Sequence, residues 1–418
     1  MLKKTFLFVI FYVLLSSNVY SQENITENWK FNGEVLLRSE ADGRDFNNST
    51  PLNFYTIMRT RFSMEKMLLE NTDFYLQIED SRIFGEEGSA VANLRNIDMF
   101  QGYINFIKPF KIPFDIQIGR FIMDYGTTRF FSSLPGWNYI GRSFDGIRVK
   151  NKNDYFNIDI FSLITNTASR YISNATPDLY SSIVPNINNT INGFWLNKNI
   201  GFNEINLFSY YEYNRKQTKV GFSDLSRLTT GISHKGKYTN DFYTLEELAF
   251  QKGFISDKET NSYLISLQAY YIFLKDFNLG IGLDILSGGA NDKVNNTMDI
   301  LYGNAHAFHG YMDYFTNIPK NTSNLGLNDF YIKLKWIKEN FPLSINLDLH
   351  QFNSNISKNN MFSFGKEADL LFEYKYSNNA IIQADFSTFI PEDLFKSNSF
   401  FNKSNIGFWS YISTKYNF

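Results

Sequence analysis

Two arginines stand two positions apart in the segment MRTRF, as Arg59 and Arg61. The same spacing recurs in IRVK, which carries Arg148 and Lys150, and in KLK, which begins with Lys333. Side chains two residues apart lie on one face of an extended strand. A row of cations on one face is suited to attracting an ionic solute and relaying it along a surface. The alternative is that each cation pairs with a carboxylate and only keeps that surface hydrated and rigid.

Carboxylates follow the same alternation in several segments. The acidic positions on the polar faces are Glu79, Asp115, Asp159, Asp348, Glu367, Asp369, Glu373 and Asp385. Acidic groups therefore match or outnumber basic ones there. Because the arginines cluster in the first third of the chain, we expect a local positive patch although the formal net charge is only −2. That near-neutral charge gives no indication of a nucleic-acid partner.

Catalytic chemistry has little support in the sequence. Cys is absent, which excludes a thiol nucleophile, a disulfide and a thiolate metal site. His306 and His309 resemble a metal-binding pair, but no third ligand is evident nearby. No phosphate-binding glycine loop, G-x-S-x-G elbow or H-E-x-x-H motif is present. We therefore expect no enzymatic activity, no cofactor and no metal.

The N-terminal segment MLKKTFLFVIFYVLLSSNVYSQ has the features of a secretory signal. Two lysines precede an apolar stretch that ends near Leu15, and small or polar residues follow it. The apolar stretch is too short for a spanning helix, and no later run is long enough. We predict a signal peptide at residues 1–21, cleaved after Ser21, and a single domain at residues 22–418. The alternative is an uncleaved anchor.

The dominant pattern in this domain is strict alternation of apolar and polar side chains. In NFYTIMRTRFSM (53–64), Phe54, Met58 and Phe62 share one face while Arg59 lies on the other. Period two fits such segments and period 3.6 does not. The pattern predicts strands near residues 30–38, 53–64, 72–81, 99–108, 113–120, 142–151, 154–164, 191–198, 203–213, 226–236, 241–252, 260–273, 276–286, 326–337, 342–352, 363–375, 379–389 and 406–418. The count is about eighteen, within a range of about 16–18.

The connections between these strands indicate the fold class. Long gaps lie at residues 39–52, 82–98, 121–141, 165–190, 287–325 and 390–405, and short ones such as KNKND and KYSNN lie between them. An antiparallel β-barrel in an outer membrane has this arrangement, with tight periplasmic turns and long outer loops. The final segment GFWSYISTKYNF keeps its outward face apolar to Phe418, as expected for a strand that meets lipid while closing the barrel against the first strand. The sequence leaves open whether the long loops fill the lumen.

Arg120 is difficult to orient. In PFDIQIGRFI, Ile116 and Ile118 face lipid by alternation, which sends Arg120 outward as well. An arginine at the lipid midplane costs about 2–4 kcal/mol. Gly119 could end the strand, or form a bulge that turns Arg120 inward. The interpretations we favour are the bulge or a position at the membrane interface.

The region IGRFIMDYGTTRFFSSLPGWNYIGRSFDGIRVK (118–150) resembles the signature of the alginate-export family of outer-membrane porins. Two Gly-Arg pairs and the segment RSFDG occur in the order expected for that family. HAFHGYMDYF (306–315), GKEADLLFEY (365–374), MRTRF and EDSR (79–82) also fit. These segments span most of the mature chain.

The resemblance implies a monomeric barrel of about eighteen strands with an arginine-rich constriction for exporting a polyuronate. The implied solute contacts are Arg59, Arg61, Arg120, Arg129, Arg142 and Arg148, to which alternation adds Lys333, Glu79 and Asp369. Guanidinium groups form bidentate pairs with carboxylates, and a polyuronate carries one carboxylate per sugar. Interspersed acidic residues would keep the solute's residence short.

Inner-wall tyrosines offer a second kind of contact. Tyr55, Tyr75, Tyr103 and Tyr331 could stack on sugar faces, or they could instead fill the lumen or join an aromatic girdle. The predicted partners are outer-membrane lipid, an anionic oligo- or polysaccharide, and the barrel assembly machinery that reads a C-terminal Phe. A general diffusion porin for small ions or neutral sugars is the nearest alternative. An outer-membrane enzyme or adhesin barrel is the alternative from another class.

Overall fold

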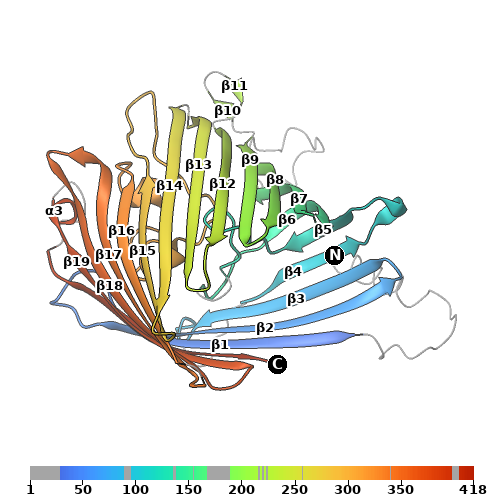
Figure 1. Cartoon of the computed structure of the whole chain (residues 1–418), viewed down its shortest axis with the longest axis horizontal. Helices are drawn as coiled ribbons and strands as arrows, with labels where there is room; N and C mark the ends of the chain where they lie inside the picture. The colour runs from blue at the N-terminus through green and yellow to red at the C-terminus, as the bar shows by residue number, and fades with distance from the viewer. Residues whose placement is uncertain are drawn as a thin grey trace.

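The chain forms a closed antiparallel β-barrel of eighteen strands (Figure 1). The computed structural model describes residues 29–418 except 89–95, 135–137, 154, 167–188, 215–216, 219–220, 223–224, 257, 339 and 398–403. The predicted signal peptide at residues 1–21 lies outside the described residues. Among those residues, no helix is long and apolar enough to span a membrane.

The barrel strands follow one another around the wall in chain order. They are β1 Lys30–Gly43, β2 Asn53–Leu69, β3 Thr72–Ile83, β4 Ile97–Phe106, β5 Asp115–Phe121, β6 Phe144–Lys152, β7 Asn157–Asn166, β8 Asn189–Ile200, β9 Asn203–Tyr213, β12 Leu225–Lys237, β13 Phe242–Ile255, β14 Lys258–Phe273, β15 Phe277–Leu286, β16 Leu327–Ile337, β17 Leu343–Lys358, β18 Met361–Lys375, β19 Ala380–Pro391 and β20 Gly407–Asn417. Smaller elements are the β10 Gln217–Thr218 and β11 Gly221–Phe222 hairpin, η1 Pro109–Lys111, η2 Ala305–Ala307, α2 Ile318–Asn321 and α3 Asp393–Lys396. Each strand that the alternation predicted is present, so the predicted fold class is confirmed.

The last strand closes the barrel against the first. β20 pairs with β1 in antiparallel register from Glu34↔Asn417 to Gly43↔Phe408. Just beyond this pairing, Gly33 and Phe418 exchange two backbone hydrogen bonds of 2.7 and 2.9 Å. The terminal residue therefore completes the ring of hydrogen bonds, and it leaves no open sheet edge at the seam.

Short turns join the strands at one end of the barrel and most long loops lie at the other. The β17–β18 connection is an exception, because only Asn359 and Asn360 separate those strands. Both have positive φ, 53° and 62°, which asparagine tolerates and a two-residue hairpin requires.

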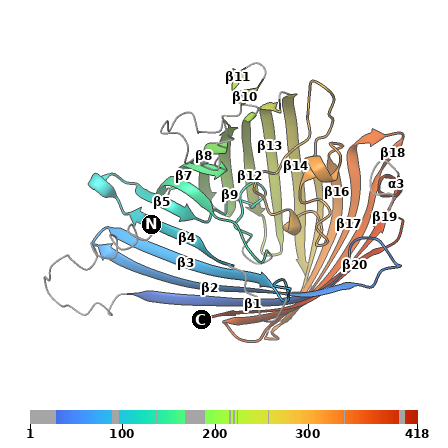
Figure 2. The same cartoon turned by 180° about the vertical axis from the view of Figure 1, so that it is seen from behind.

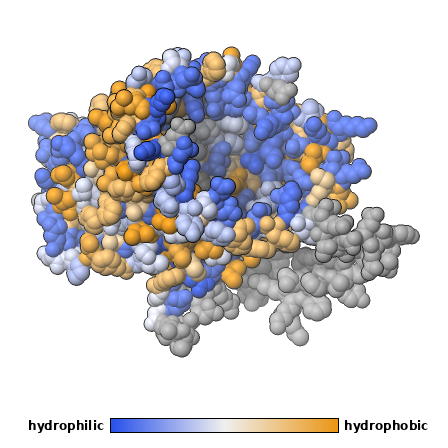
Figure 3. Space-filling view, turned by 60° about the horizontal axis from the view of Figure 1, so that its bottom comes forward, coloured by the Kyte–Doolittle hydropathy of each residue, from blue (hydrophilic) through white to orange (hydrophobic). Residues whose placement is uncertain are grey.

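The outer wall is apolar, as alternation predicted. Phe54 is 74% exposed and Ile412 62% exposed, although both lie within strands. Figure 3 shows such residues gathered over the wall, with hydrophilic residues along its margins. Hydrocarbon is the environment that makes this burial pattern favourable.

Two long loops fold into the lumen, which answers the question that the sequence left open. They are the β5–β6 loop (residues 122–143) and the β15–β16 loop (residues 287–326), and Figures 1 and 2 show both within the ring of strands. A parallel bridge between Phe131 and Tyr302 joins them. Hydrogen bonds from Tyr302 N to Phe130 O and from Ser132 N to Tyr302 O, both 3.0 Å, flank this bridge. The two loops therefore form one body, which we call the plug.

The hydrophobic core lies inside the barrel, where the plug meets the wall. Phe131 is fully buried against Phe144 and Phe161 of the wall, and Phe315 of the plug contacts Phe352. Burying a phenylalanine contributes about 1.5–3 kcal/mol. Many such side chains hold the plug, so it is an integral part of the fold.

The orientation of Arg120 corrects our choice of it as a lining residue. β5 continues through Gly119 to Phe121, and its pairing with β4 and β6 has no register shift. Gly119 has φ 134°, yet the alternation holds: Phe121 lies inside the barrel, and Arg120 lies outside with Asp145. The guanidinium forms a bidentate pair of 2.8 Å bonds with that carboxylate at the strand end. An interface position is tolerable because the cost of an outward arginine falls to about 0–1 kcal/mol there.

Candidate functional site

The first group of candidate residues lies on β1, β2 and β3, which we call the basic wall. Arg59 Nη2 lies 2.6 Å from Glu34 Oε1, and Arg61 Nε lies 2.5 Å from Glu79 Oε2. Neighbouring strands supply the two members of each pair, because inward residues of adjacent strands face one another. Arg59 is fully buried and Arg61 nearly so. These arginines already have carboxylate partners.

The basic wall also holds the β5–β6 loop. Arg59 donates to the carbonyl of Asn138, and Arg61 Nη2 donates to the carbonyl of Ile140 at 3.0 Å. Arg61 also stacks on Phe100, with the guanidinium carbon 3.7 Å from the ring centre. Two of the predicted solute contacts thus bind carbonyls of the plug.

Arg129 fastens the same loop to the opposite part of the wall. It lies 2.7 Å from Asp284 of β15 and 3.4 Å from Glu247 of β13, and its Nη2 donates to Ser266 of β14 at 2.9 Å. Phe308 covers the guanidinium at 3.9 Å. Only 1% of the Arg129 side chain is exposed, and neighbouring carboxylates raise the pKa of the guanidinium against the effect of burial. A buried cation with this many partners is a structural anchor.

Arg142 joins the two halves of the plug in a different way. Its Nη1 donates to the carbonyls of Tyr302 and, at 3.2 Å, Ser132. Burial lowers the pKa of the guanidinium, which still stays charged at neutral pH. Within the part of the chain that the structure describes, no carboxylate lies at ion-pair distance from Arg142, and Nε and Nη2 donate no hydrogen bond. Arg142 is half-buried, and its Nε and Nη2 groups can donate two parallel hydrogen bonds to an acceptor from outside the protein.

Arg148 and Lys333 line the lumen closer to the short turns. Arg148 donates to Gln117 at 3.0 and 2.5 Å and lies 3.5 Å from Asp159. Lys333 lies 2.6 Å from Asp348. Their side chains are 13% and 21% exposed, so both remain within reach of the aqueous lumen.

A second group of charges lies on β18 and β19, which we call the acidic wall. Glu367 accepts a 2.8 Å hydrogen bond from the backbone N–H of Met312, and Asp369 accepts one of 3.4 Å from Tyr311. Asp385 accepts from Ser387 at 2.7 Å. Each of these carboxylates is buried, and each keeps one oxygen with no partner in the described structure. The acidic wall therefore holds the β15–β16 loop through its N–H groups.

A cavity of about 410 Å³ lies at the short-turn end of β1–β3. Asn32, Glu34 and Tyr75 line this cavity, and the ring of Tyr75 stacks on Tyr103 at 5.1 Å. A second stacked pair at 4.7 Å, Tyr243 with Tyr270, was missing from the sequence prediction, although alternation places both rings inside. Stacked rings beside water are suited to contact with sugar faces.

The other two predicted tyrosines, Tyr55 and Tyr331, donate hydrogen bonds to carboxylates of the barrel wall. The hydroxyl of Tyr55 donates to Glu40 at 2.5 Å, and that of Tyr331 donates to Asp284 at 3.3 Å. Sequence reasoning also missed Arg38, which pairs with Glu40 at 2.7 Å on the basic wall. Its inward parity on β1 was the signal that could have identified it.

Comparison with known proteins agrees with this geometry. The family model for alginate export matches residues 31–398. No curated protein sequence matches the chain. Among solved structures, a BenF-like porin from Pseudomonas fluorescens Pf-5 is similar, with a TM-score of 0.60 at 11% identity, covering 94% of this chain and 98% of that one. The Pseudomonas aeruginosa outer membrane protein opdK has a TM-score of 0.58 at 10% identity, with 93% and 98% covered, and P. aeruginosa OccK11 (OpdR) has 0.57 at 10%, with 93% and 95% covered. Identities this low establish the shared barrel fold only.

Proposed function

Because the chain belongs to the alginate export family of outer-membrane porins, we propose that it passes an anionic oligosaccharide or polyuronate through its lumen. Family and fold are those of a transport barrel in the outer membrane of a Gram-negative bacterium. We expect a monomer without enzymatic activity. We also expect the C-terminal Phe418 to serve recognition by the barrel assembly machinery.

The environment of Arg142 is the single observation that supports an anionic solute. Arg142 is a charged, half-buried guanidinium on the plug, and no carboxylate in the described structure lies within ion-pair distance of it. Its Nε and Nη2 edge has the geometry that binds a carboxylate through two parallel hydrogen bonds. A uronate carboxylate fits this edge, whereas a neutral sugar gains nothing from its charge.

Arg148 and Lys333 are the further solute contacts that we propose. Each is partly exposed and already lies beside a carboxylate, Asp159 or Asp348. A solute carboxylate would compete with that partner, so it would be bound weakly and released quickly, as conduction requires. The stacked pair Tyr75–Tyr103 then offers apolar faces to the sugar rings.

For Arg59, Arg61 and Arg129 we propose an indirect role. Their guanidinium groups are almost inaccessible and bind the wall and the plug. They fix the position of the loop that carries Arg142. Glu79 and Asp369 act in the same way, through Arg61 and through the backbone of Tyr311.

The test is conductance in planar bilayers with an added oligouronate. The expected result is ion conduction that prefers anions and that the oligouronate blocks. Arg142→Ser should reduce the anion preference and weaken the block by about 10- to 100-fold, the effect of losing one bidentate pair of about 1.5–3 kcal/mol. Arg120→Ser is the matched control, because that arginine lies on the outer face. If Arg142→Ser keeps the block of the unaltered protein, Arg142 is not a solute contact.

A general diffusion porin is the second candidate, and the acidic wall favours it. Carboxylates such as Glu367, Asp369 and Asp385 would, where they are ionised, repel a polyanion that passed close to them. Equal block by neutral and anionic oligosaccharides would support this candidate. A complete lack of conductance would instead favour an enzyme or adhesin barrel.

A further inference from the structure

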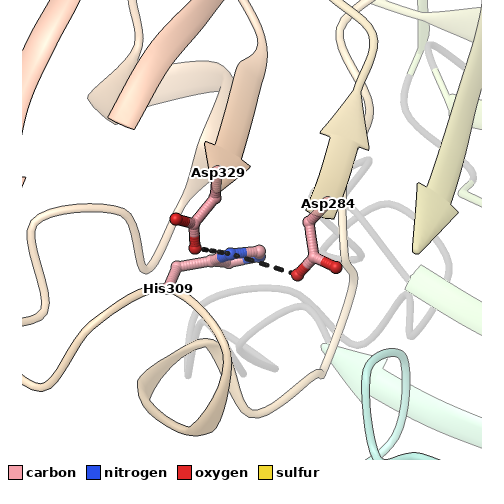
Figure 4. Close-up of side chains that lie close together, drawn as sticks. All are labelled: Asp284, His309 and Asp329. Carbon is pink, nitrogen blue, oxygen red and sulfur yellow. Dashed lines mark ion pairs between the residues drawn. The ribbon is translucent and has the colours of Figure 1, made fainter. Parts of the chain in front are cut away.

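Three ionisable side chains meet inside the barrel at a place that the solute pathway does not use. Asp284 of β15 and Asp329 of β16 are directly opposite one another in the sheet, and both face inward. His309 of the plug reaches between them (Figure 4). Its Nδ1 lies 3.9 Å from Asp284 Oδ2 and 3.8 Å from Asp329 Oδ2. One ligand atom from each residue lies within 4.8 Å of the other two.

The imidazole ring of this cluster lacks hydrogen bonds within the described part of the chain. His309 is 1% exposed, yet neither ring nitrogen has a hydrogen-bond partner in the described structure. Its nearest oxygens are too distant for a hydrogen bond. Two carboxylates in one buried cross-strand pair also repel each other. A cation between the three groups would satisfy the imidazole and remove this repulsion.

The two nitrogen–oxygen distances fit a shared metal ion. A zinc ion takes histidine nitrogen at about 2.0–2.1 Å and carboxylate oxygen at about 2.0–2.2 Å. Two such bonds span up to about 4.1–4.3 Å between ligand atoms, and the observed nitrogen–oxygen separations of 3.8 and 3.9 Å lie within this limit. One imidazole and two carboxylates are ligands that Zn²⁺ and similar divalent transition metals accept.

The surroundings support the ligands. Asp284 Oδ1 accepts hydrogen bonds from Arg129 at 3.0 Å and from Tyr331 at 3.3 Å, and His350 Nδ1 lies 3.0 Å from both oxygens of Asp329. Such outer contacts orient metal-binding carboxylates.

We propose that Asp284, His309 and Asp329 bind one divalent transition-metal ion, with zinc as the representative. No further ligand beside His306 and His309 was evident in the sequence, because the two carboxylates come from strands that flank the loop and meet only in the sheet. Since His309 belongs to the plug and the two aspartates to the wall, the ion fastens the plug in the lumen. This site does not depend on which solute the barrel passes.

The experiment measures zinc binding to the purified full-length barrel in detergent after treatment with a chelator. Titration calorimetry should give one equivalent of Zn²⁺ per chain, and zinc should raise the thermal unfolding temperature. His309→Ala should abolish both effects. His306→Ala is the matched control, because His306 bonds to Asp313 outside the cluster at 3.0 Å and should leave both effects intact.

A second variant keeps the test decisive if His309→Ala fails to fold. Asp329→Asn preserves the shape of the side chain and should weaken zinc binding at least tenfold, with barrel formation checked by circular dichroism. Stoichiometric zinc binding that survives both substitutions would overturn the site. So would a chelator-treated protein that binds no zinc, because His309 would then be held by its two carboxylates alone.

Discussion

The basic wall and the acidic wall hold the plug through opposite chemistry. On the basic wall, Arg59 and Arg61 donate hydrogen bonds to carbonyl oxygens of the β5–β6 loop. On the acidic wall, Glu367 and Asp369 accept hydrogen bonds from N–H groups of the β15–β16 loop. The backbone of a loop in the lumen needs partners for both kinds of group. Each wall satisfies one kind.

The walls differ in how their own charges are balanced. On the basic wall, Arg59 and Arg61 have carboxylates on neighbouring strands, Glu34 and Glu79. Arg38 has its carboxylate, Glu40, on its own strand. The acidic wall has no such pairing at Glu367, Asp369 or Asp385 in the described part of the chain. Removing a charge from the basic wall should therefore lower the free energy of unfolding, whereas removing a charge from the acidic wall should raise it. Charged residues inside a barrel are not all available to a solute, because some are already used to position loops.

The largest expected effect is at Arg61. Arg61→Ala removes the cation from a buried pair and leaves Glu79 with only the hydroxyl of Ser81. We expect a loss of about 3–5 kcal/mol in the free energy of unfolding, measured by urea titration of the refolded barrel. Release of the Ile140 carbonyl should also make single-channel currents noisier.

The control for this prediction is the exposed pair on the outer wall. Arg120→Ala breaks an ion pair whose side chains are 30% and 52% exposed, so it should cost at most about 1 kcal/mol. Equal losses for Arg61→Ala and Arg120→Ala would contradict the view that burial of the basic wall makes its pairs essential.

A smaller effect is expected where the acidic wall meets the plug. Gly310 has φ 82°, and a Cβ there would lie 2.4 Å from Glu367 Oε1. Gly310→Ala should displace the loop from the wall and reduce the free energy of unfolding. Gly85 is the matched control, with φ 84° and no atom within 4 Å of an added Cβ. We expect Gly310→Ala to cost about 1–3 kcal/mol more than Gly85→Ala in the same urea titration. Equal costs would mean that the plug does not press on Glu367.

The alternation of apolar and polar residues predicted the barrel well, because lipid on one side of every strand requires that alternation. A strand with hydrocarbon on one side and water or plug on the other must alternate, so the inward direction of Arg59, Arg61 and Asp369 followed from parity. Of the two interpretations favoured for Arg120, the bulge at Gly119 was wrong and the interface position agrees with the structure. The strand stays regular, and the position of Arg120 at its end makes the outward orientation tolerable.

The plug was beyond this reasoning because no periodicity governs a loop. Which loop enters the lumen depends on contacts between distant segments, such as Phe131 with Tyr302. One signal was available: FF at 130–131 and MDYF at 312–315 are apolar segments inside long loops, and such residues need burial. The Asp284–Asp329 pair could not be found either, because it depends on the register of β15 and β16.

The smallest expected effect has the opposite sign and separates the two walls most clearly. Asp385 is fully buried, one of its oxygens has no partner in the described structure, and Asp369 acts on it as a like charge. Asp385→Asn keeps an oxygen for the Ser387 hydroxyl and removes the negative charge that the carboxyl group carries once it is ionised, so at alkaline pH the barrel should gain up to about 1 kcal/mol of unfolding free energy. Asp348→Asn on β17 is the matched control, because Asp348 pairs with Lys333 at 2.6 Å and its loss should destabilise the barrel. Urea titrations in which both variants lose stability equally would show that the acidic wall is balanced by charge, as the basic wall is.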